Sequence, residues 1–457
     1  MKLINLLTFI LFLASSCSHA PLVSKEDMAF LEDITRAVVD SSRILPGQDL
    51  PPAIRSFGPN RSGITLIKPG GRDCYPSFWI RDYAMSLESG LITPKEQLDI
   101  LLYTAARQSD STWRTKTGSL VPIGSIPDHI RINDGLPIYF PGTYVYGDQG
   151  NEIWRQPPFC DEFYFIHMAW YYLKSIDDKG LLNQAVNNIN LYKRLAMAFD
   201  EVPFKPDHQM AFISDSLPTC DFGFRDVVSM TGEVCFGSLL RYRAALEMAE
   251  ISGWMAQVSE KNAGLIGPVD YRKNSAGYRS VAYKIKLYLA EVFAEERGLL
   301  RASTGRSKEP DVWATAFAIY IGALDGSKAN RASVELSKAY RAGTMTMEGQ
   351  IRHILTTDDF SSSTAWEKAL AGKNSYQNGA YWGTATGWVC YALARTDRDA
   401  AKQLASEFIA HLRKTDFRLP GPNHGGPYEC IYPPTGYTQN PVYMTSVTGP
   451  LGILRAL

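Results

Sequence analysis

Apolar residues recur every three or four positions along most of this 457-residue chain. That spacing places them on one face of an α-helix and predicts a largely helical protein. The helix expected from residue 94 has the clearest start signal, because Thr93 can cap it, Pro94 takes its first position and Glu96 completes a capping box. The periodic segments cover residues 25–43, 79–90, 94–109, 162–176, 179–199, 231–252, 274–297, 311–324, 329–342, 379–395, 397–414 and 441–457.

The connections between these helices nearly alternate between short and long. Only a few residues join helices two and three, four and five, eight and nine, and ten and eleven. Loops rich in Gly, Pro and aromatic residues cover 44–78, 110–161, 200–230, 343–378 and 415–440. Six helical hairpins closed into a ring give this alternation, with the long loops at one end. We therefore expect one all-α (α/α)₆ barrel domain over residues 18–457, since the repeated consensus of a stacked solenoid is not visible.

Residues 1–17 have the organisation of an export signal. Lys2 precedes an apolar run at 3–14, which is too short for a stable membrane span and ends in small residues before Cys17. The ending Ala-Ser-Ser-Cys resembles a bacterial lipobox, in which the cysteine becomes the lipidated N-terminus. We expect a lipid anchor on Cys17, the only contact with a membrane, and a place in the cell envelope. Cleavage after Ala20 and release into the periplasm is the alternative.

Charge and short motifs exclude several classes of function. Lys plus Arg and Asp plus Glu both number 47, so the chain lacks the basic excess with which nucleic-acid binders neutralise phosphates. The sequence contains no HExxH zinc helix, GxSxG elbow or P-loop, and its cysteines are widely spaced. We expect no nucleic-acid partner, no metal and no cofactor. Aromatic residues are 12% of the chain, and many lie in loops, where they can contact the apolar faces of a carbohydrate.

Carboxylates, amides and aromatic residues gather where loops meet helices. Each carboxylate alone can be explained as a helix cap or a dipole partner. In the expected barrel, however, these junctions lie at one end of the ring, which indicates a functional site there. The segments are FWIRDY (78–83), PPFCDEF (157–163), CDFGFRDVVSMTGE (220–233), DVWAT (311–315), YQNGAYW (376–382) and PYECIYPPTGYTQNPVY (427–443).

Two of these segments resemble motifs of known enzymes. Trp79-Ile80-Arg81-Asp82 resembles the W-x-R-D motif of glucoamylases and of the glucosidase domain of glycogen-debranching enzymes, and residues 376–382 resemble a late motif of the debranching type. Both groups are six-hairpin glycosidases, as are trehalases. The likeness covers scattered motifs from about residue 77 onward. It implies a hydrolase that acts on an α-linked carbohydrate with inversion, in which Arg81 and Asp82 bind sugar hydroxyls beside the scissile bond.

The same resemblance implies a general acid in the middle of the chain and a general base near its end. Hydrolysis needs one protonated carboxyl to assist the leaving oxygen and one ionised carboxylate to activate water. Glu429 is the only acidic residue after Asp416 and is the candidate base. Asp226 is the preferred acid and Asp221 the alternative, with Asp221 or Glu233 close enough in sequence to raise its pKa. Glucoamylase itself uses two Glu.

Further candidates for sugar binding follow from the same segments. Asp161 and Glu162 open a helix and can bind hydroxyls, and aromatic residues can form stacking walls. His353 and His424 lie in loops at the expected mouth, where a histidine can orient a carboxylate or bind a hydroxyl. The aromatic and polar candidates for substrate contact are Trp79, Trp313, Asn378, Tyr381, Trp382 and His424.

Two other functions remain open at the level of sequence. Sugar 2-epimerases share the helical barrel and abstract a proton with a pair of histidines, a role for which His353 and His424 are the candidates. A surface lipoprotein that binds glycans without cleaving them would keep the aromatic residues and need no carboxylate pair. The hydrolase is the leading hypothesis, because Asp226 and Glu429 stand where an acid and a base are required.

Overall fold

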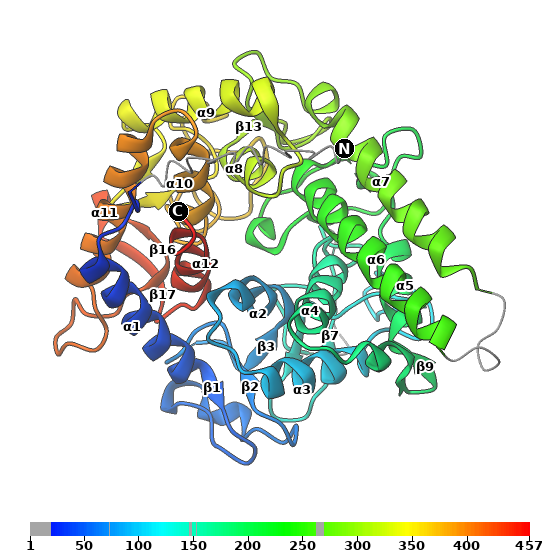
Figure 1. The fold of residues 1–457 in the computed structure, drawn as a ribbon. Helices are drawn as coiled ribbons and strands as arrows, with labels where there is room; N and C mark the ends of the chain where they lie inside the picture. The colour runs from blue at the N-terminus through cyan, green and yellow to red at the C-terminus, as the bar shows by residue number, and fades with distance from the viewer. Residues whose placement is uncertain (1–19, 73, 146–148, 152, 262–268) are drawn as a thin grey trace, which may run out of the picture.

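Six helices touch one another in chain order and close into a ring, within the part of the chain that the computed structural model describes (residues 20–72, 74–145, 149–151, 153–261 and 269–457). Figure 1 looks down the axis of this ring, and α12 returns to α2 to complete it. The inner helices are α2 (Ile80–Ser86), α4 (Asp161–Ser175), α6 (Cys235–Lys261), α8 (Val312–Tyr320), α10 (Thr386–Ala394) and α12 (Thr445–Leu454).

A second set of helices surrounds the inner ring (Figure 1). Each outer helix packs on at least one inner helix, so the two sets alternate along the chain. This arrangement is the predicted (α/α)₆ barrel, and the fold prediction is confirmed. The outer helices are α1 (Lys25–Ser42), α3 (Pro94–Ala105), α5 (Leu191–Glu201), α7 (Tyr271–Val292), α9 (Gly326–Arg341) and α11 (Arg398–Lys414).

The residue composition of the helices explains which ones lie inside. α8 and α10 are apolar around almost their whole circumference and are buried on every side. A helix of that kind is stable only when other elements surround it. α11, by contrast, buries one stripe that includes Leu404 and Phe408 and exposes charged residues on the other face. One-sided burial is what an outer position in the barrel requires.

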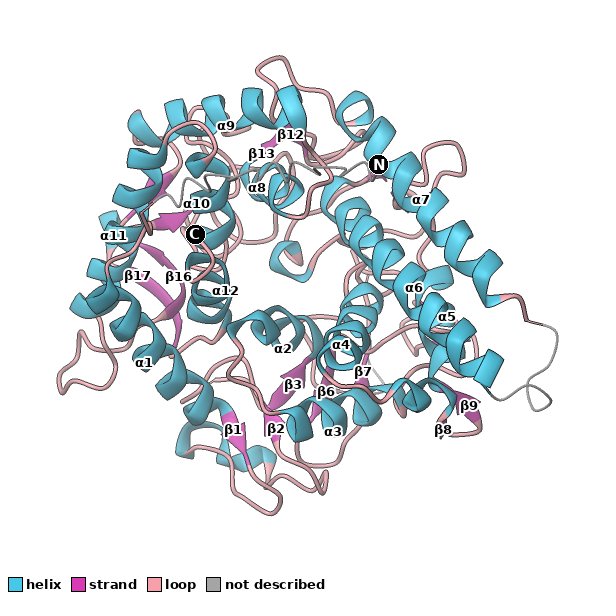
Figure 2. Ribbon diagram, viewed as in Figure 1, coloured by secondary structure: helices cyan, strands magenta, loops and turns pink. Residues whose placement is uncertain are grey.

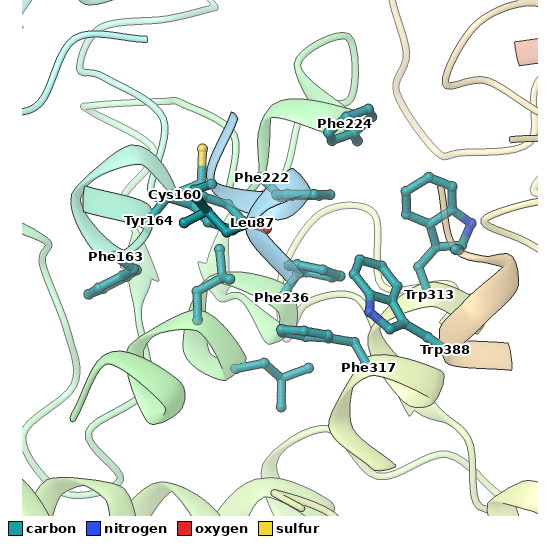
Figure 3. Close-up of a cluster of buried hydrophobic side chains, with 14 of the residues drawn as sticks. Leu87, Cys160, Phe163, Tyr164, Phe222, Phe224, Phe236, Trp313, Phe317 and Trp388 are labelled. Atoms are coloured by element: carbon teal, nitrogen blue, oxygen red, sulfur yellow. The ribbon is translucent and has the colours of Figure 1, made fainter. Parts of the chain in front are cut away.

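Buried aromatic rings from several inner helices form one cluster (Figure 3). Phe222 stacks on Phe236 with centroids 4.2 Å apart, Phe236 stacks on Phe317 at 4.9 Å, and Phe317 meets Trp388 at 4.8 Å. These side chains come from the loop before α6 and from α6, α8 and α10, so they link three inner helices. Their burial provides a rigid floor beneath the end of the ring where the inner helices begin.

Short strands occupy the connections between helices (Figure 2). In the largest sheet, β3 (Ser77–Trp79), β6 (His129–Arg131) and β7 (Pro137–Ile138) are antiparallel, and Trp79 pairs with His129. β16 (Tyr428–Tyr432) and β17 (Tyr437–Pro441) form a hairpin. The remaining pairs are β1 (Arg43–Ile44) with β2 (Leu66–Ile67), β4 (Trp113–Arg114) with β5 (Leu120–Val121), β8 (Ala185–Val186) with β9 (Ile189–Asn190), β10 (Phe212–Ile213) with β11 (Gly232–Glu233), β12 (Leu300–Arg301) with β13 (Pro310–Asp311) and β14 (Thr346–Met347) with β15 (Gln350–Ile351).

Two predicted helix starts are wrong. The segment 179–199 begins with a 3₁₀ turn and the β8–β9 hairpin before α5, because Asn187 and Asn188 adopt left-handed conformations that make a two-residue turn. The segment 379–395 is helical only from Thr386 onward. Residues 383–385 form a bend and a turn before it, and Trp382 pairs its backbone with Ile351 of β15. Both errors arise from turn and pairing geometry that apolar spacing does not report.

The predicted export signal, including Cys17, lies outside the described residues. None of the helices in the described part is both long and apolar enough to span a membrane. None of the six cysteines of that part forms a disulfide, and all except Cys74 are buried.

Candidate active site

A cavity of about 290 Å³ lies at the end of the ring where the inner helices begin. The first turn of α2, the loop before α6, the strand β16 and the residues just before α12 all contribute to its wall. The long loops therefore meet at one mouth, as predicted. Its lining consists of Pro69, Tyr75, Trp79, Arg81, Asp82, His129, Pro141, Gly142, Thr143, Tyr144, Trp154, Gly223, Phe224, Asp226, Val227, Tyr376, Glu429 and Tyr443.

Five of the predicted site residues line this cavity. They are Trp79, Arg81, Asp82, Asp226 and Glu429. A sixth, Asp161, lies directly behind the wall, with Oδ2 3.5 Å from Arg81 Nη1. Carboxyl groups that are more than 300 residues apart in the sequence thus face one space, which the closure of the barrel makes possible.

Two predicted stacking residues belong to the floor instead of the wall. Trp313 and Trp382 are fully buried beneath Phe224, which itself faces the cavity. His353 stacks on Trp313 at 3.9 Å, and burial lowers its pKa well below the ordinary histidine value. These rings support the site from below, and none of the three lines the cavity.

Three other predicted contacts also lie outside the cavity. Asn378 binds the backbone of its own loop through Ala365 N and Ala371 O. Tyr381 is buried, and its backbone pairs with Ile431 of β16. His424 lies in the loop before β16, with Nδ1 2.6 Å from the Pro420 carbonyl. Isolated bridges explain the first two positions, because Asn378 pairs with Ser375 and Tyr381 pairs with Ile431. The histidine pair proposed for an epimerase is therefore not assembled in the cavity.

Asp226 lines the cavity, whereas the neighbouring acids Asp221 and Glu233 do not. Asp221 is buried away from the cavity and caps α6, accepting hydrogen bonds from the N–H groups of Phe236 and Gly237. Glu233 pairs with His208 at 3.0 Å. Glu162 is also structural, since its carboxylate accepts the Ile126 N–H.

Arg81 is the only cation among several buried acids in the described wall. Its Nη1 lies 2.5 Å from Asp128 and 3.5 Å from Asp161, and its Nε lies 3.9 Å from Asp82. The backbone of Gly223 covers the guanidinium so closely that a Cβ there would lie 1.9 Å from Nε. Only glycine permits this approach. The guanidinium is thus fixed in one orientation at the wall of the cavity.

Glu429 is held by two side chains from different loops. Oε2 accepts hydrogen bonds from Tyr75 Oη at 2.8 Å and from Asn440 Nδ2 at 2.6 Å. Burial nevertheless raises the pKa of Glu429 to about 8. Both partners have left-handed backbones, with φ of 63° at Tyr75 and 34° at Asn440, as do Tyr376 and Val442 nearby. Strained conformations of this kind concentrate at functional sites, where the surrounding structure holds them.

Asp226 and Asp82 are the other two carboxyls in the wall. Gln377 donates a hydrogen bond to Asp226, and burial raises the pKa of Asp226 to about 7. Tyr443 donates to Asp82 at 2.6 Å, and burial raises the pKa of that group to about 6. Three carboxyls facing one cavity thus have pKa values in the range that acid–base catalysis near neutral pH requires.

Several residues in and behind the wall escaped the sequence analysis. His129 begins β6 and Asp128 directly precedes it in the segment SIPDHIRI, where two adjacent polar residues interrupt an apolar run, a signal that was available. Tyr75, Gln377 and Asn440 act through contacts with residues far away in the chain, and nothing in their local sequence indicates those contacts. Among the described residues, no group of His, Cys, Asp or Glu is arranged to hold a metal ion.

Solved structures with a similar fold include two glucoamylases. That of Hormoconis resinae matches with a TM-score of 0.53 and 12% identity, over 94% of this chain and 73% of that one. The Glycoside Hydrolase Family 15 glucoamylase of Hypocrea jecorina gives 0.55 and 12%, over 94% and 72%. An uncharacterised conserved protein from Thermus thermophilus gives 0.52 and 11%, over 92% and 99%. No protein-family model and no curated protein matches the sequence. These likenesses establish the fold, a six-hairpin (α/α)₆ barrel like that of glucoamylases.

Proposed function

We propose that this protein is an inverting glycoside hydrolase acting on an α-linked substrate, with Asp226 as general acid and Glu429 as general base. The observation that carries the proposal is that these two buried carboxyls line one cavity together with Arg81 and Asp82. The resemblance of the W-x-R-D segment to glucoamylases and the glucoamylase-like fold support it. The α-linkage of the substrate and the inversion at the anomeric carbon are inferred from the resemblance to glucoamylases.

The chemistry assigns a separate task to each carboxyl. Asp226 protonates the glycosidic oxygen as the bond to the anomeric carbon breaks, and Glu429 takes a proton from a water that attacks the opposite face of the ring. The water needs space, so the two carboxyls of an inverting enzyme stand roughly 6.5–9.5 Å apart. Arg81 and Asp82 bind hydroxyls of the same sugar. Tyr75, Trp79 and Tyr144 supply aromatic surfaces to the cavity wall.

The charges around the cavity favour a neutral sugar. Asp82, Asp226 and Glu429 line it, Asp128 and Asp161 lie immediately behind, and Arg81 is already paired with these acids. A uronate or sulfated sugar would bring another anion into this buried cluster, where like charges repel strongly. We therefore place neutral hexosides ahead of acidic sugars as substrates.

A screen against p-nitrophenyl glycosides and α-linked oligosaccharides tests the proposal. Hydrolysis followed by proton NMR identifies the first anomer released, and a β-anomer from an α-glycoside establishes inversion. Binding of oligosaccharides without cleavage would favour the glycan-binding alternative. Interconversion of free sugars would favour the epimerase, and loss of that activity in His353→Ala or His424→Ala would identify its bases.

We expect kcat/KM to be highest between about pH 7 and 8. The pKa of the base Glu429 is raised to about 8 and that of the acid Asp226 to about 7, so the required form, with Glu429 ionised and Asp226 protonated, is a minor fraction of the enzyme at every pH. That fraction is largest midway between the two pKa values, because Glu429 gains a proton at lower pH and Asp226 loses one at higher pH. A pH–rate profile for the best substrate measures this. An optimum near pH 4 to 5, where unperturbed carboxyls titrate, would contradict the effect of burial.

We propose further that the protein is exported and anchored in the cell envelope by lipid on Cys17. The support is the charged and apolar start of the chain and the Ala-Ser-Ser-Cys ending. Mass spectrometry of the mature N-terminus in the native host is expected to show a diacylglyceryl-modified Cys17. An unmodified chain that begins at Pro21 would contradict the anchor and leave simple secretion.

A further inference from the structure

His129 is a cavity residue for which the proposed mechanism has no role. Its ring stacks on Trp79, with centroids 4.4 Å apart and an interplanar angle of 19°, and Tyr144 meets it at 5.3 Å. The residue is 1% exposed and lines the cavity. Stacking and strand pairing together fix the plane of the imidazole, so its two nitrogens point in set directions.

Asp128 holds one edge of this imidazole. One carboxylate oxygen accepts from Arg81 Nη1 at 2.5 Å, and the other lies 2.7 Å from His129 Nδ1. Burial opposes the charge on Asp128, but Arg81 and His129 outweigh it and hold the pKa of this carboxyl below its usual value. An ionised carboxylate can only accept, so Nδ1 donates to it, and Nε2 on the other side of the ring is left for another partner.

Nε2 is the nitrogen without a partner. None of the described residues forms a hydrogen bond with it, and the same holds for the indole N–H of Trp154 in the same wall. Buried polar atoms are almost always paired, because an unpaired one costs free energy. The cavity therefore presents two polar atoms that a ligand can satisfy.

We propose that His129 is a specificity-determining residue, whose Nε2 forms a hydrogen bond with one hydroxyl of the sugar ring in the cavity. Asp128 is the positioning residue that fixes the orientation of the ring. This inference rests on the proposed function and deepens it by naming the group that is recognised. A sugar without this hydroxyl leaves the buried Nε2 unpaired, so the pair selects a sugar with a free hydroxyl at that position.

Removal of single hydroxyls from the ligand tests the contact. Calorimetry measures binding of D-glucose, D-mannose and D-galactose, and then of the 2-, 3-, 4- and 6-deoxy derivatives of the sugar that binds best. We expect one deoxy derivative to bind the wild type about tenfold more weakly than its parent, the scale of one hydrogen bond. His129→Phe keeps the stacking on Trp79. It should bind the parent sugar about tenfold more weakly and no longer distinguish it from that derivative.

The matched control is His167→Phe. His167 is also a buried histidine paired with a carboxylate, at 2.6 Å from Glu247, but it lies on α4 and does not line the cavity. The His167→Phe substitution should leave the preference among the deoxy sugars unchanged. If His129→Phe retains the wild-type preference, the inference is overturned, whereas hydrolysis by the wild type would still support the proposed function.

A second measurement is made first on the wild type, so it does not depend on a variant that might unfold. With ¹⁵N-labelled imidazoles, the Nε2 resonance of His129 should shift when the parent sugar binds, whereas that of His167 should not. Asp128→Asn changes the hydrogen bond at Nδ1, so it should reduce this shift and weaken binding of the same sugar. An Nε2 resonance of His129 that is the same with and without bound sugar would overturn the inference. A wild type that neither binds sugars nor cleaves glycosides would overturn the proposed function and this inference together.

Discussion

Asp226→Asn is expected to reduce kcat/KM for a glycoside with a poor leaving group by about 10²- to 10⁴-fold, the usual contribution of a positioned general acid. The amide has nearly the same shape but cannot donate the proton to the glycosidic oxygen. A 2,4-dinitrophenyl glycoside departs without protonation, so the variant should cleave it at close to the wild-type rate. Parallel assays of the two leaving groups, on the sugar identified by the screen, measure the difference.

Glu429→Gln should behave differently from Asp226→Asn. The base is required for attack by water whichever group departs, so turnover should fall by about 10²-fold or more on both substrates. Glu233→Gln is the matched control, because Glu233 is an acid of the neighbouring loop that pairs with His208 and does not line the cavity. If the leaving group rescues Glu429→Gln and not Asp226→Asn, the two roles are reversed.

Arg81→Ala is expected to destabilise the protein by about 3–5 kcal/mol, the cost of removing one partner from a buried ion pair. Asp128 and Asp161 would remain in the interior without the cation that lies beside them. Urea unfolding at neutral pH measures the change. Arg81 contributes to holding the pKa of Asp128 below its usual value. Ionised Asp128 therefore stabilises the wild-type fold at pH values above the usual pKa, and this contribution is lost as the pH falls through the lowered pKa. The difference between variant and wild type should therefore narrow in acid.

Arg413→Ala provides the contrast for this prediction. Arg413 pairs with Asp27 at 2.9 Å, but both side chains are more than a third exposed. An exposed pair of this kind contributes about 0–1 kcal/mol. Equal losses in the two variants would show that the cluster around Arg81 has no special role in stability. Sugar binding should be lost in Arg81→Ala alone, since only Arg81 lines the cavity.

Much of the fold follows from the sequence because helices are local structures. Apolar spacing and capping residues act within a few turns, so the positions of the twelve helices and the capping box at Thr93 could be predicted. Alternating loop lengths then indicated a ring of hairpins. The resemblance of the W-x-R-D segment to glucoamylases marked one part of the cavity wall, and Glu429, the only acid after Asp416, marked another.

Tertiary structure decided which of several equivalent residues face the cavity. Asp221 and Asp226 are five positions apart in similar surroundings, and only the packing of α6 turns the first into a helix cap. Trp313 and Trp382 became the floor because Phe224 covers them. His129 reached the wall, with Asp128 behind it, because β6 pairs with β3 across about fifty residues. Contacts between distant segments depend on the complete fold, and a local pattern contains no record of them.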